Sequence, residues 1–478
     1  MERPERELRQ LTTHRAIDSA RLPSTVGRPA VSRRSLGEMA QWSEDLATAK
    51  LVGLAGDEKR AAAILKRFSR QRDIIARIVS DQNLLSGIRV IDCGTYIAAP
   101  AAAVIMSDFG AEVIKIERPP MGDPYRYLSL VPGMPVSDKL YCWIATGRNK
   151  KSVGLNLESE AGREALLRLV ETADVFITNY QASLLEKFRI SESDLRPLND
   201  RLIYAHLTGY GETGPDASRP GYDVTAYWAR SGLMFGMHNA GSEPVQSPAG
   251  FGDHPTAMSI FAGIMLGLYR RQITGQGTHV STSLMANGAW SNFCGLQASF
   301  VGAQWLPRWN RSTVPNPIVN HYITRDEKRF MICCLDPKHD WSRLCRALES
   351  PELIGDPRFS SPESRRANAP ALVEFIDRNV AQKDMAEWIE IFGQNDVVWG
   401  PVPNTDEVSR DPQMHMNGVF PEIAPGLHTV NSPINVAGVQ KVKPHMGSPV
   451  GADTVEMLKS LGYTDEAIQQ LIQSGSAC

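Results

Sequence analysis

An aspartate that stands directly before a long apolar segment is the residue in this sequence best placed to do chemistry. The run is Phe251-Gly252-Asp253-His254-Pro255. A carboxylate presented there can act as a covalent nucleophile, and Gly252 would leave backbone access for a substrate. A structural interpretation competes, because an aspartate two residues before a proline is also a good N-cap for a helix. Position alone favours the N-cap.

A second group of residues that could do chemistry is basic. It consists of Arg118, Arg126, Arg148, Asn149, Lys150 and Lys151. Lysine and arginine gathered beside the loops of an α/β fold suit phosphate groups. A solvated surface loop is the alternative interpretation. A nucleic-acid-binding stripe is not expected, because the body of the chain is net acidic.

Several well-known site signatures are absent from the sequence. The first strand-to-helix turn, residues 93–100, has one glycine, so a dinucleotide fingerprint for NAD or FAD is not expected. There is no P-loop, no Gly-x-Ser-x-Gly elbow, no Cys-x-x-Cys pair and no His-x-x-x-His spacing. We therefore predict no metal site. His206, within a predicted strand, and His254, beside Asp253, remain open as supporting residues.

The elements that must position these residues alternate between strands and helices. The predicted strands are residues 88–91, 112–117, 174–178, 202–207 and 278–284. The predicted helices are residues 98–109, 161–172, 192–198 and 255–271. This alternation predicts a parallel α/β sheet, and such sheets bind ligands beyond the carboxyl ends of their strands.

The alternation of strands and helices ends at about residue 305. A predicted hairpin over residues 322–335 then precedes three predicted helices near 338–348, 370–381 and 383–393. Two more helices, near 452–461 and 464–473, are expected to return to the large domain. The predicted domains are 1–85, a basic and partly helical extension; 86–304, the first part of a large α/β domain; 305–414, a small domain; and 415–478, the return.

Composition places the chain among ordinary globular proteins. Hydrophobic residues make up 42% of its 478 residues, and no apolar run reaches the ~18 residues needed to cross a bilayer. Residues 1–80 hold 16 lysines and arginines against 10 acidic residues, whereas the remainder holds 35 against 43. Helices are predicted at residues 36–51 and 57–80. Seven scattered cysteines, no apolar signal segment and early acidic residues together predict a cytoplasmic protein with reduced thiols and no membrane contact.

Taken in order, a series of short motifs resembles one known family. The motifs are Gly87-Ile88-Arg89-Val90-Ile91-Asp92, Ala99-Pro100, Asp108-Phe109-Gly110-Ala111-Glu112-Val113-Ile114-Lys115-Ile116-Glu117, Gly122-Asp123 with Arg126, Arg148-Asn149-Lys150-Lys151-Ser152, Leu155-Asn156-Leu157, Asn179-Tyr180, Leu207-Thr208-Gly209-Tyr210-Gly211, Thr274-Gly275-Gln276-Gly277 and Ser283-Leu284. They resemble class III CoA-transferases, the carnitine and formyl-CoA transferase family, which also contains α-methylacyl-CoA racemase. The resemblance covers about residues 86–478.

The resemblance implies a fold and a reaction. The fold would be a Rossmann-like large domain with a smaller α+β domain, in a homodimer whose subunits interlock. The protein would be an enzyme that moves CoA from an acyl-CoA donor to a carboxylic acid acceptor. Coenzyme A and its thioesters would be substrates, and no tightly bound cofactor is implied. Asp253 matches the family nucleophile, which forms aspartyl anhydride and aspartyl-CoA thioester intermediates.

The resemblance also implies a set of CoA-binding residues. They are Ala98, Arg118, Leu155, Asn179, Tyr180 and Lys187. Two positions depart from the family pattern. Arg189 stands where the family often has glycine, and Ile97 stands where it often has glutamine or glutamate, so contacts to the pantetheine arm are expected to differ there.

Two alternative functions follow from the same resemblance. A 2-methylacyl-CoA racemase would need a histidine in a Gly-His-Asp motif, but this chain has Gly221-Tyr222-Asp223, and tyrosine is a poor base at neutral pH. A CoA-binding paralogue without turnover is the other alternative. The acyl groups stay open. The aromatic residues that would line an apolar pocket, or else belong to the core, are Trp228, Phe235, Trp290, Trp305 and Trp309.

Overall fold

A computed structural model of the chain describes residues 83–336 and 339–478. The helices predicted over residues 36–51 and 57–80 lie outside the described residues. The described residues belong to one compact unit. None of the described helices is long and apolar enough to cross a membrane.

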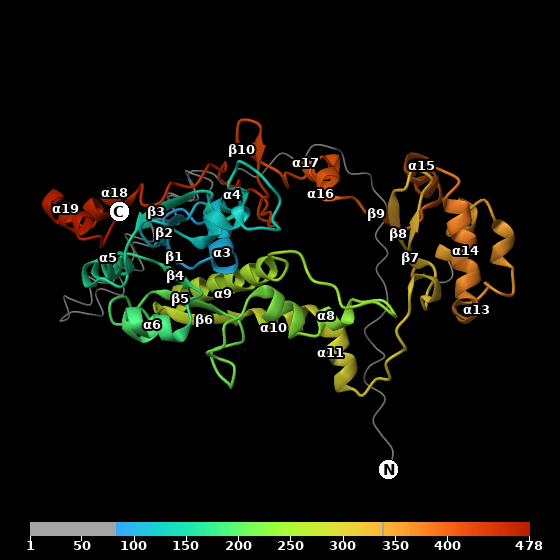
Figure 1. Ribbon diagram of the computed structural model, residues 1–478, viewed down its shortest axis with the longest axis horizontal. Coiled ribbons are helices and arrows are strands. Elements are labelled where there is room, and N and C mark those ends of the chain that lie inside the picture. Colours follow the sequence, from blue (N-terminus) through green and yellow to red (C-terminus); the bar gives the residue numbers. More distant parts are fainter. Residues whose placement is uncertain (1–82, 337–338) are drawn as a thin grey trace, which may run out of the picture. The chain divides into compact units, whose positions relative to one another are not determined.

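A six-stranded, wholly parallel sheet forms the centre of the large part of the chain (Figure 1). Its strands are β1 (Arg89–Cys93), β2 (Glu112–Glu117), β3 (Lys150–Gly154), β4 (Val175–Thr178), β5 (Ile203–Thr208) and β6 (Thr278–Ser283). They lie in the order β3-β2-β1-β4-β5-β6, with Val90 of β1 level with Val113 of β2 and Val175 of β4. The order reverses between β1 and β4, which is where parallel sheets bind ligands. The predicted parallel α/β sheet is confirmed.

Both faces of the sheet are covered, because alternate residues of each strand point to opposite sides. Val90, Val113 and Ile177 join one apolar core with two helices, α3 (Ala98–Asp108) and α9 (Asp253–Thr274). Ile91, Ile114 and Phe176 join a second core on the other face. Strands β1 to β5 are therefore buried on both sides, whereas the edge strand β6 has exposed positions along its length.

Short local signals set the bounds of the surrounding helices. All eleven residues of α3 are buried, and five of them are alanine, which lets the helix pack closely on the sheet. The 22-residue α9 ends at Gly275, whose φ of 80° only glycine adopts without strain. The other helices of this part are η1 (Pro124–Leu130), α4 (Tyr141–Gly147), α5 (Glu160–Glu171), α6 (Ala182–Phe188), α7 (Glu192–Leu195), η2 (Asp223–Ala229), α8 (Leu233–Gly236), α10 (Leu284–Ser291) and α11 (Phe293–Phe300).

A second module has its own sheet and core. Its antiparallel strands are β7 (Val319–Ile323), β8 (Arg329–Cys333) and β9 (Trp399–Pro401). Its helices are η3 (Arg311–Thr313), α12 (Asp340–Ala347), η4 (Pro351–Ile354), α13 (Pro362–Ala367), α14 (Ala369–Val380) and α15 (Met385–Asn395). Phe330, Trp388 and Phe392 form the centre of a core that is separate from the two cores of the parallel sheet.

The C-terminal segment carries short elements and then two helices. The elements are α16 (Thr405–Val408), α17 (Pro412–Met416), β10 (Glu422–Ala424), β11 (Leu427–His428), α18 (Thr454–Ser460) and α19 (Asp465–Gln473). Leu458 of α18 and Ile468 of α19 belong to the same core as α5. The chain end therefore packs on the parallel sheet, where Leu155 pairs with Ala477.

One strand of the parallel sheet was missed by the sequence-based prediction. Residues 150–154, Lys-Lys-Ser-Val-Gly, form β3 at the edge of the sheet. Apolar periodicity is absent from this segment, because its inward-facing positions are Lys150 and Ser152, which pair with acidic residues of the neighbouring strands. A charged strand of this kind is stable only where its partners are in place.

Candidate functional site

Asp253 is the first residue of α9, and Gly252 precedes it at the N-cap position. The structural interpretation of Asp253 as the N-cap is therefore wrong: the helix starts two residues earlier than predicted. Gly252 is required here by space. A Cβ atom on it would lie 2.4 Å from the ring of Tyr227. The glycine thus allows the turn to press against Tyr227 and to present Asp253 at the helix end.

The carboxylate of Asp253 is half-buried, and no hydrogen-bond donor contacts it in the described part of the chain. Burial, and then the nearby charge of Asp223, raise its pKa to about 7. This outweighs the partial positive charge at the start of α9, which favours the ionised form. At neutral pH the Asp253 carboxyl is therefore close to half ionised. The ionised form can act as a nucleophile.

Asp223 has the opposite character, because its carboxylate is tied to the backbone. Its Oδ2 accepts the N–H of Gly252 at 3.3 Å and its Oδ1 accepts the N–H of Val224 at 2.8 Å. Asp223 is buried at the start of η2. It therefore holds the turn before Asp253 and places a negative charge beside the free carboxylate. Sequence reasoning considered Asp223 only as part of the racemase motif.

An apolar wall lies next to this turn. A Cβ on Gly250 would come within 3.2 Å of Ile97, and Ile97 packs in a small cluster with Tyr125 and Cys142. Burial, then Cys142 and then Asp253, raise the pKa of Tyr125, so its hydroxyl stays protonated. No sequence motif pointed to Tyr125 or Cys142, since they join Asp253 only through the fold.

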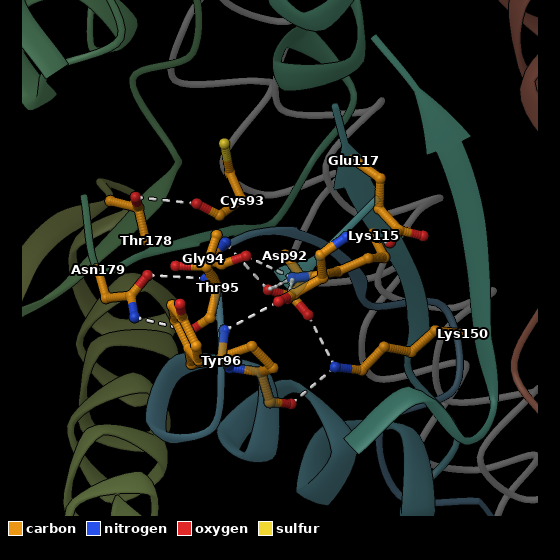
Figure 2. Close-up of polar contacts among 12 residues, drawn as sticks. Asp92, Cys93, Gly94, Thr95, Tyr96, Lys115, Glu117, Lys150, Thr178 and Asn179 are labelled. Carbon is orange, nitrogen blue, oxygen red and sulfur yellow. Dashed lines mark hydrogen bonds and ion pairs between the residues drawn. The ribbon is translucent and has the colours of Figure 1, made fainter. Parts of the chain in front are cut away.

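The turn between β1 and α3 is held rigidly (Figure 2). Asn179 accepts the N–H of Thr95 at 2.8 Å and donates to its carbonyl at 2.9 Å. The N–H of Tyr96 donates to Asp123 at 3.1 Å, which holds Tyr96 at a φ of 63°. Non-glycine residues adopt this left-handed conformation rarely, and such strain persists where the surroundings impose it. The turn ends at Ala98, the buried first residue of α3.

A buried ionic network lies under that turn. Lys150 donates to Asp92 at 2.7 Å and to the carbonyl of Pro100 at 2.7 Å. Lys115 pairs with Asp123 at 2.9 Å and donates to the carbonyl of Gly94. Figure 2 shows both lysines pointing inward from neighbouring strands toward Asp92. The network ties three strands to the turn that precedes α3.

The predicted phosphate role of the basic cluster is wrong for three of its members. Lys150 is buried in the network, Arg148 forms two hydrogen bonds with Asp108, and Arg126 forms two with Glu117. The alternative of a solvated loop is wrong for them as well. Their charges are satisfied inside the protein, so they are closed to an incoming phosphate.

Three of the six predicted CoA-binding residues line one pocket. Arg118, Leu155 and Tyr180 line it, together with Ile116, Glu117, Asn156, Leu157, Glu158 and Phe188. Tyr180 directly follows Asn179, which holds the turn between β1 and α3, and burial raises the pKa of Tyr180 well above the usual value. Lys187 lies beside the pocket and pairs with Glu158 at 2.7 Å, and Arg118 approaches the same carboxylate at 3.7 Å. Two exposed cations therefore flank the opening.

The two departures from the family pattern have structural explanations. Arg189 follows the last residue of α6 with a φ of 51°, so it adopts the left-handed conformation in which glycine is usual. Its side chain pairs with Glu160 at 2.7 Å in solvent. Ile97 is buried in the apolar cluster and offers no polar group to a ligand.

The remaining candidates are placed as follows. His254 follows Asp253 in α9 and is exposed. His206 contacts Glu212 and the carbonyl of Tyr180. Of the five aromatic residues predicted to line a pocket or belong to the core, Trp228 is in the core, whereas Phe235, Trp290, Trp305 and Trp309 are exposed. The interpretation of these four as core residues is therefore wrong.

The fold and the site together define a class of protein. Residues 85–454 match the family described as CoA-transferase family III, and the chain belongs to that family. It is similar to the cinnamoyl-CoA:phenyllactate CoA-transferase of Clostridium sporogenes, with 32% identity over 405 residues that cover 82% of this chain and 97% of that protein.

A second relative and a solved structure agree with this assignment. The chain is 30% identical over 400 residues to the (R)-2-hydroxy-4-methylpentanoate CoA-transferase of Clostridioides difficile, covering 82% of this chain and 98% of that protein. The crystal structure of a CAIB/BAIF family protein from Brucella suis superposes with a TM-score of 0.70 and 26% identity, covering 79% of this chain and 99% of that one.

Proposed function

We propose that this protein is a class III CoA-transferase of the formyl-CoA/carnitine type, which moves CoA from an acyl-CoA donor to a free carboxylic acid with Asp253 as nucleophile. Asp253 carries the proposal: a half-buried carboxylate at a helix N-terminus, without a hydrogen-bond donor in the described part of the chain, and with a pKa raised to about 7. Family membership supplies the reaction class.

The proposed reaction proceeds through activated acyl groups. The ionised carboxylate of Asp253 attacks the thioester carbonyl of the donor, and CoA thiolate leaves, so an aspartyl acyl anhydride forms. The thiolate attacks the aspartyl carbonyl and expels the donor as a carboxylate, leaving an aspartyl-CoA thioester. The acceptor carboxylate then attacks the aspartyl carbonyl and releases thiolate again. The thiolate finally attacks the acceptor carbonyl of this second anhydride, which yields the new acyl-CoA and regenerates Asp253.

The proposed path of CoA follows the carboxyl ends of the strands. Arg118 and Lys187 would meet the nucleotide end, and Leu155 and Tyr180 would form the wall of the pocket. Asn179 links this pocket to the turn before Ala98, and the contact between Gly250 and Ile97 links that turn to Asp253. The N–H groups at the start of α9 would stabilise the oxyanion that develops beside Asp253.

The acceptor class is proposed from the relatives. In the names of the two clostridial enzymes the acid is a 2-hydroxy acid with an apolar side chain. An acceptor panel should therefore include phenyllactate and branched 2-hydroxy acids beside dicarboxylates such as glutarate, which the name of a human relative at 28% identity carries. Mass spectrometry of the acyl-CoA products would identify the pair that exchanges fastest.

The first prediction tests the nucleophile. Asp253→Ala should abolish exchange between an acyl-CoA and a labelled acceptor acid, because the anhydride cannot form, whereas the exposed Asp465→Asn on α19 should leave it unchanged. Hydroxylamine added during turnover should modify Asp253 alone. Exchange retained in Asp253→Ala would contradict the mechanism.

Two other results would favour the alternative functions. Solvent deuterium entering the α-carbon of a 2-methylacyl-CoA without any acceptor would indicate a racemase. Tight CoA binding without exchange would indicate a non-catalytic paralogue.

We also propose the family architecture for this chain: a Rossmann-like large domain over 86–304 and 415–478, a small domain over 305–414, an extension over 1–85, and an interlocked homodimer. The strand order β3-β2-β1-β4-β5-β6 and the separate core of the small module support the division. Seven free cysteines support a cytoplasmic location. The partners are then an acyl-CoA, a carboxylic acid and a second copy of the chain.

A further inference from the structure

Two histidines and a glutamate converge beside the outer strands of the sheet. His206 lies on β5, His279 on β6, and Glu212 in the loop that follows β5. The Nδ1 atom of His206 is 2.6 Å from Oε1 of Glu212, and Nε2 of His279 is 3.0 Å from the same oxygen. All three ligand atoms lie within 4.8 Å of one another.

The parallel register of the sheet brings the two histidines to one face. Tyr204 is level with His279 and His206 with Ser281, so His206 and His279 project to the same side of neighbouring strands. The ring of Tyr204 packs beside both, with its centroid 6.4 Å from His206 and 5.4 Å from His279, and the two imidazole centroids are 6.5 Å apart. Both imidazoles thus project from strands of the sheet.

The hydrogen bond on the far side of His206 determines which of its nitrogens can act as a ligand. Nε2 lies 3.0 Å from the carbonyl oxygen of Tyr180, and because a carbonyl only accepts, Nε2 carries the hydrogen. In the neutral ring Nδ1 is then a lone pair aimed at a carboxylate oxygen, which is repulsive unless a proton or a metal ion lies between them. A backbone carbonyl behind a histidine is the usual arrangement for a metal ligand.

In the described part of the chain, the carboxylate of Glu212 contacts the two imidazoles and has no permanent cation as an ion-pair partner. Among residues 83–336 and 339–478, no lysine or arginine pairs with Glu212. Arg196, which acts electrostatically on His279, is itself paired with Glu192 at 2.7 Å. The side chains are 8% exposed for His206, 33% for Glu212 and 35% for His279, so a cation has a way in from solvent.

We propose that His206, Glu212 and His279 form a binding site for a divalent transition-metal ion of the Zn²⁺ class. Two imidazoles and one carboxylate, with a water in the fourth position, are a recurring tetrahedral set for Zn²⁺. Ligand bonds of ~2.0–2.1 Å place the ligand atoms about 3.3 Å apart. The Glu212 oxygen would therefore move away from Nδ1 of His206, now at 2.6 Å, by about 0.7 Å, and from Nε2 of His279, now at 3.0 Å, by about 0.3 Å. The site is separate from Asp253 and needs no step in CoA transfer.

The site also touches the proposed CoA pocket through one residue. The carbonyl that accepts from His206 belongs to Tyr180, which lines the pocket. A metal on Nδ1 of His206 would hold the ring and, through it, the segment after β4. Metal binding itself is the claim, and it can be measured without any CoA.

The test uses full-length protein stripped with a chelator and then given ZnCl2 or CoCl2. Wild type should retain one Zn²⁺ per chain after gel filtration, measured by mass spectrometry, and bound Co²⁺ should show the intense visible absorption of four-coordinate sites. His279→Gln and Glu212→Gln should each weaken binding by more than the ~10–100-fold that loss of an outer hydrogen-bond partner costs. Zn²⁺ should raise the Tm of wild type and not of these variants.

The matched control is His428→Gln. His428 and His415 form another imidazole pair, with ring centroids 5.9 Å apart, outside the proposed cluster. This variant should bind Zn²⁺ like wild type. Circular dichroism of the metal-free proteins establishes that each variant is folded. Wild type that retains no metal, or equal retention in His279→Gln and Glu212→Gln, overturns the proposal and leaves the cluster as imidazoles that share protons with a carboxylate.

Discussion

At the scale of the residue, the two aspartates of the site divide two tasks between them. Asp223 is fastened to the backbone N–H groups of Gly252 and Val224, while Asp253 is left without a donor in the described chain. Asp223 therefore sets the position of the turn before Asp253, and Asp253 keeps a reactive carboxylate. A pKa raised to about 7 also makes the aspartate a better nucleophile once ionised, because basicity and nucleophilicity rise together.

The pH dependence of catalysis follows from this pair. With Asp253 as nucleophile, kcat/KM should rise with pH through a pKa of about 7 and level off above it. Asp223→Asn removes a like charge beside Asp253 and so lowers the pKa of Asp253. The rise of kcat/KM with pH should therefore occur at lower pH in this variant. Profiles of log kcat/KM between pH 5 and 9 measure this. An unchanged pKa in the profile of the variant would show that Asp223 does not act electrostatically on Asp253.

The same pKa predicts a cost in stability. Folding raises the pKa of Asp253 from 3.8 to about 7, so the stabilisation present below pH 4 is lost as the pH rises to about 7. Asp253→Asn should therefore match the Tm of wild type near pH 4, exceed it increasingly up to pH 7, and keep a constant advantage above. Thermal melts across this range test the prediction, and a gap that is independent of pH would contradict it.

At the scale of the element, buried charges connect the strands to the site. Three acidic and three basic side chains, from β1, β2, β3 and the segment after β2, are buried together: Asp92, Glu117, Asp123, Lys115, Lys150 and Arg126. Their charges balance, and they hold the β1–α3 turn in its strained form. Such a network contributes little net stability but makes each member costly to remove.

Removal of one acid tests this view. Asp92→Asn should destabilise the fold by about 3 kcal/mol, the low end of the range for a broken buried pair. The low end is expected because Lys150, whose pKa burial lowers to about 8, can give up its proton. Urea unfolding measures the effect. Glu164→Gln, in the exposed pair with Arg168 on α5, should leave the midpoint nearly unchanged. Equal effects in the two variants would contradict a special role for the network.

At the scale of the whole molecule, a surface on α9 and α10 carries large apolar side chains that are exposed in the described part of the chain. Leu266, Tyr269 and Ile273 of α9 are 69%, 63% and 68% exposed, and Trp290 of α10 is 73% exposed. Large apolar side chains in this number mark an interface. They support the proposed homodimer, in which a second copy of the chain would cover them.

Disruption of this surface should separate the subunits. Leu266→Asp with Trp290→Asp would place two charges in the proposed interface, and sedimentation velocity should then detect monomer where wild type is dimer. Val136→Asp, at a fully exposed apolar residue in the loop before α4, is the control and should stay dimeric. A double variant that remains a dimer would show that the interface lies elsewhere.

The sequence by itself determined the alternation of strands and helices, the family, and the one carboxylate placed before the long helix. These are local features: periodicity and short motifs depend on neighbours in the chain. Most predicted bounds agree with the structure to within a few residues. Lys150 and Lys151 concealed a strand, because a buried charge looks like a surface charge until its partner is known.

Tertiary structure alone decided what depends on residues far apart in the chain. The pKa of Asp253 depends on Asp223, thirty positions away, and on burial that no local pattern encodes. The fate of Arg148 depends on Asp108, and the cluster of His206, Glu212 and His279 depends on the register of two strands. Electrostatic interactions act through space over a few ångströms, so their partners are chosen by the fold rather than by sequence spacing.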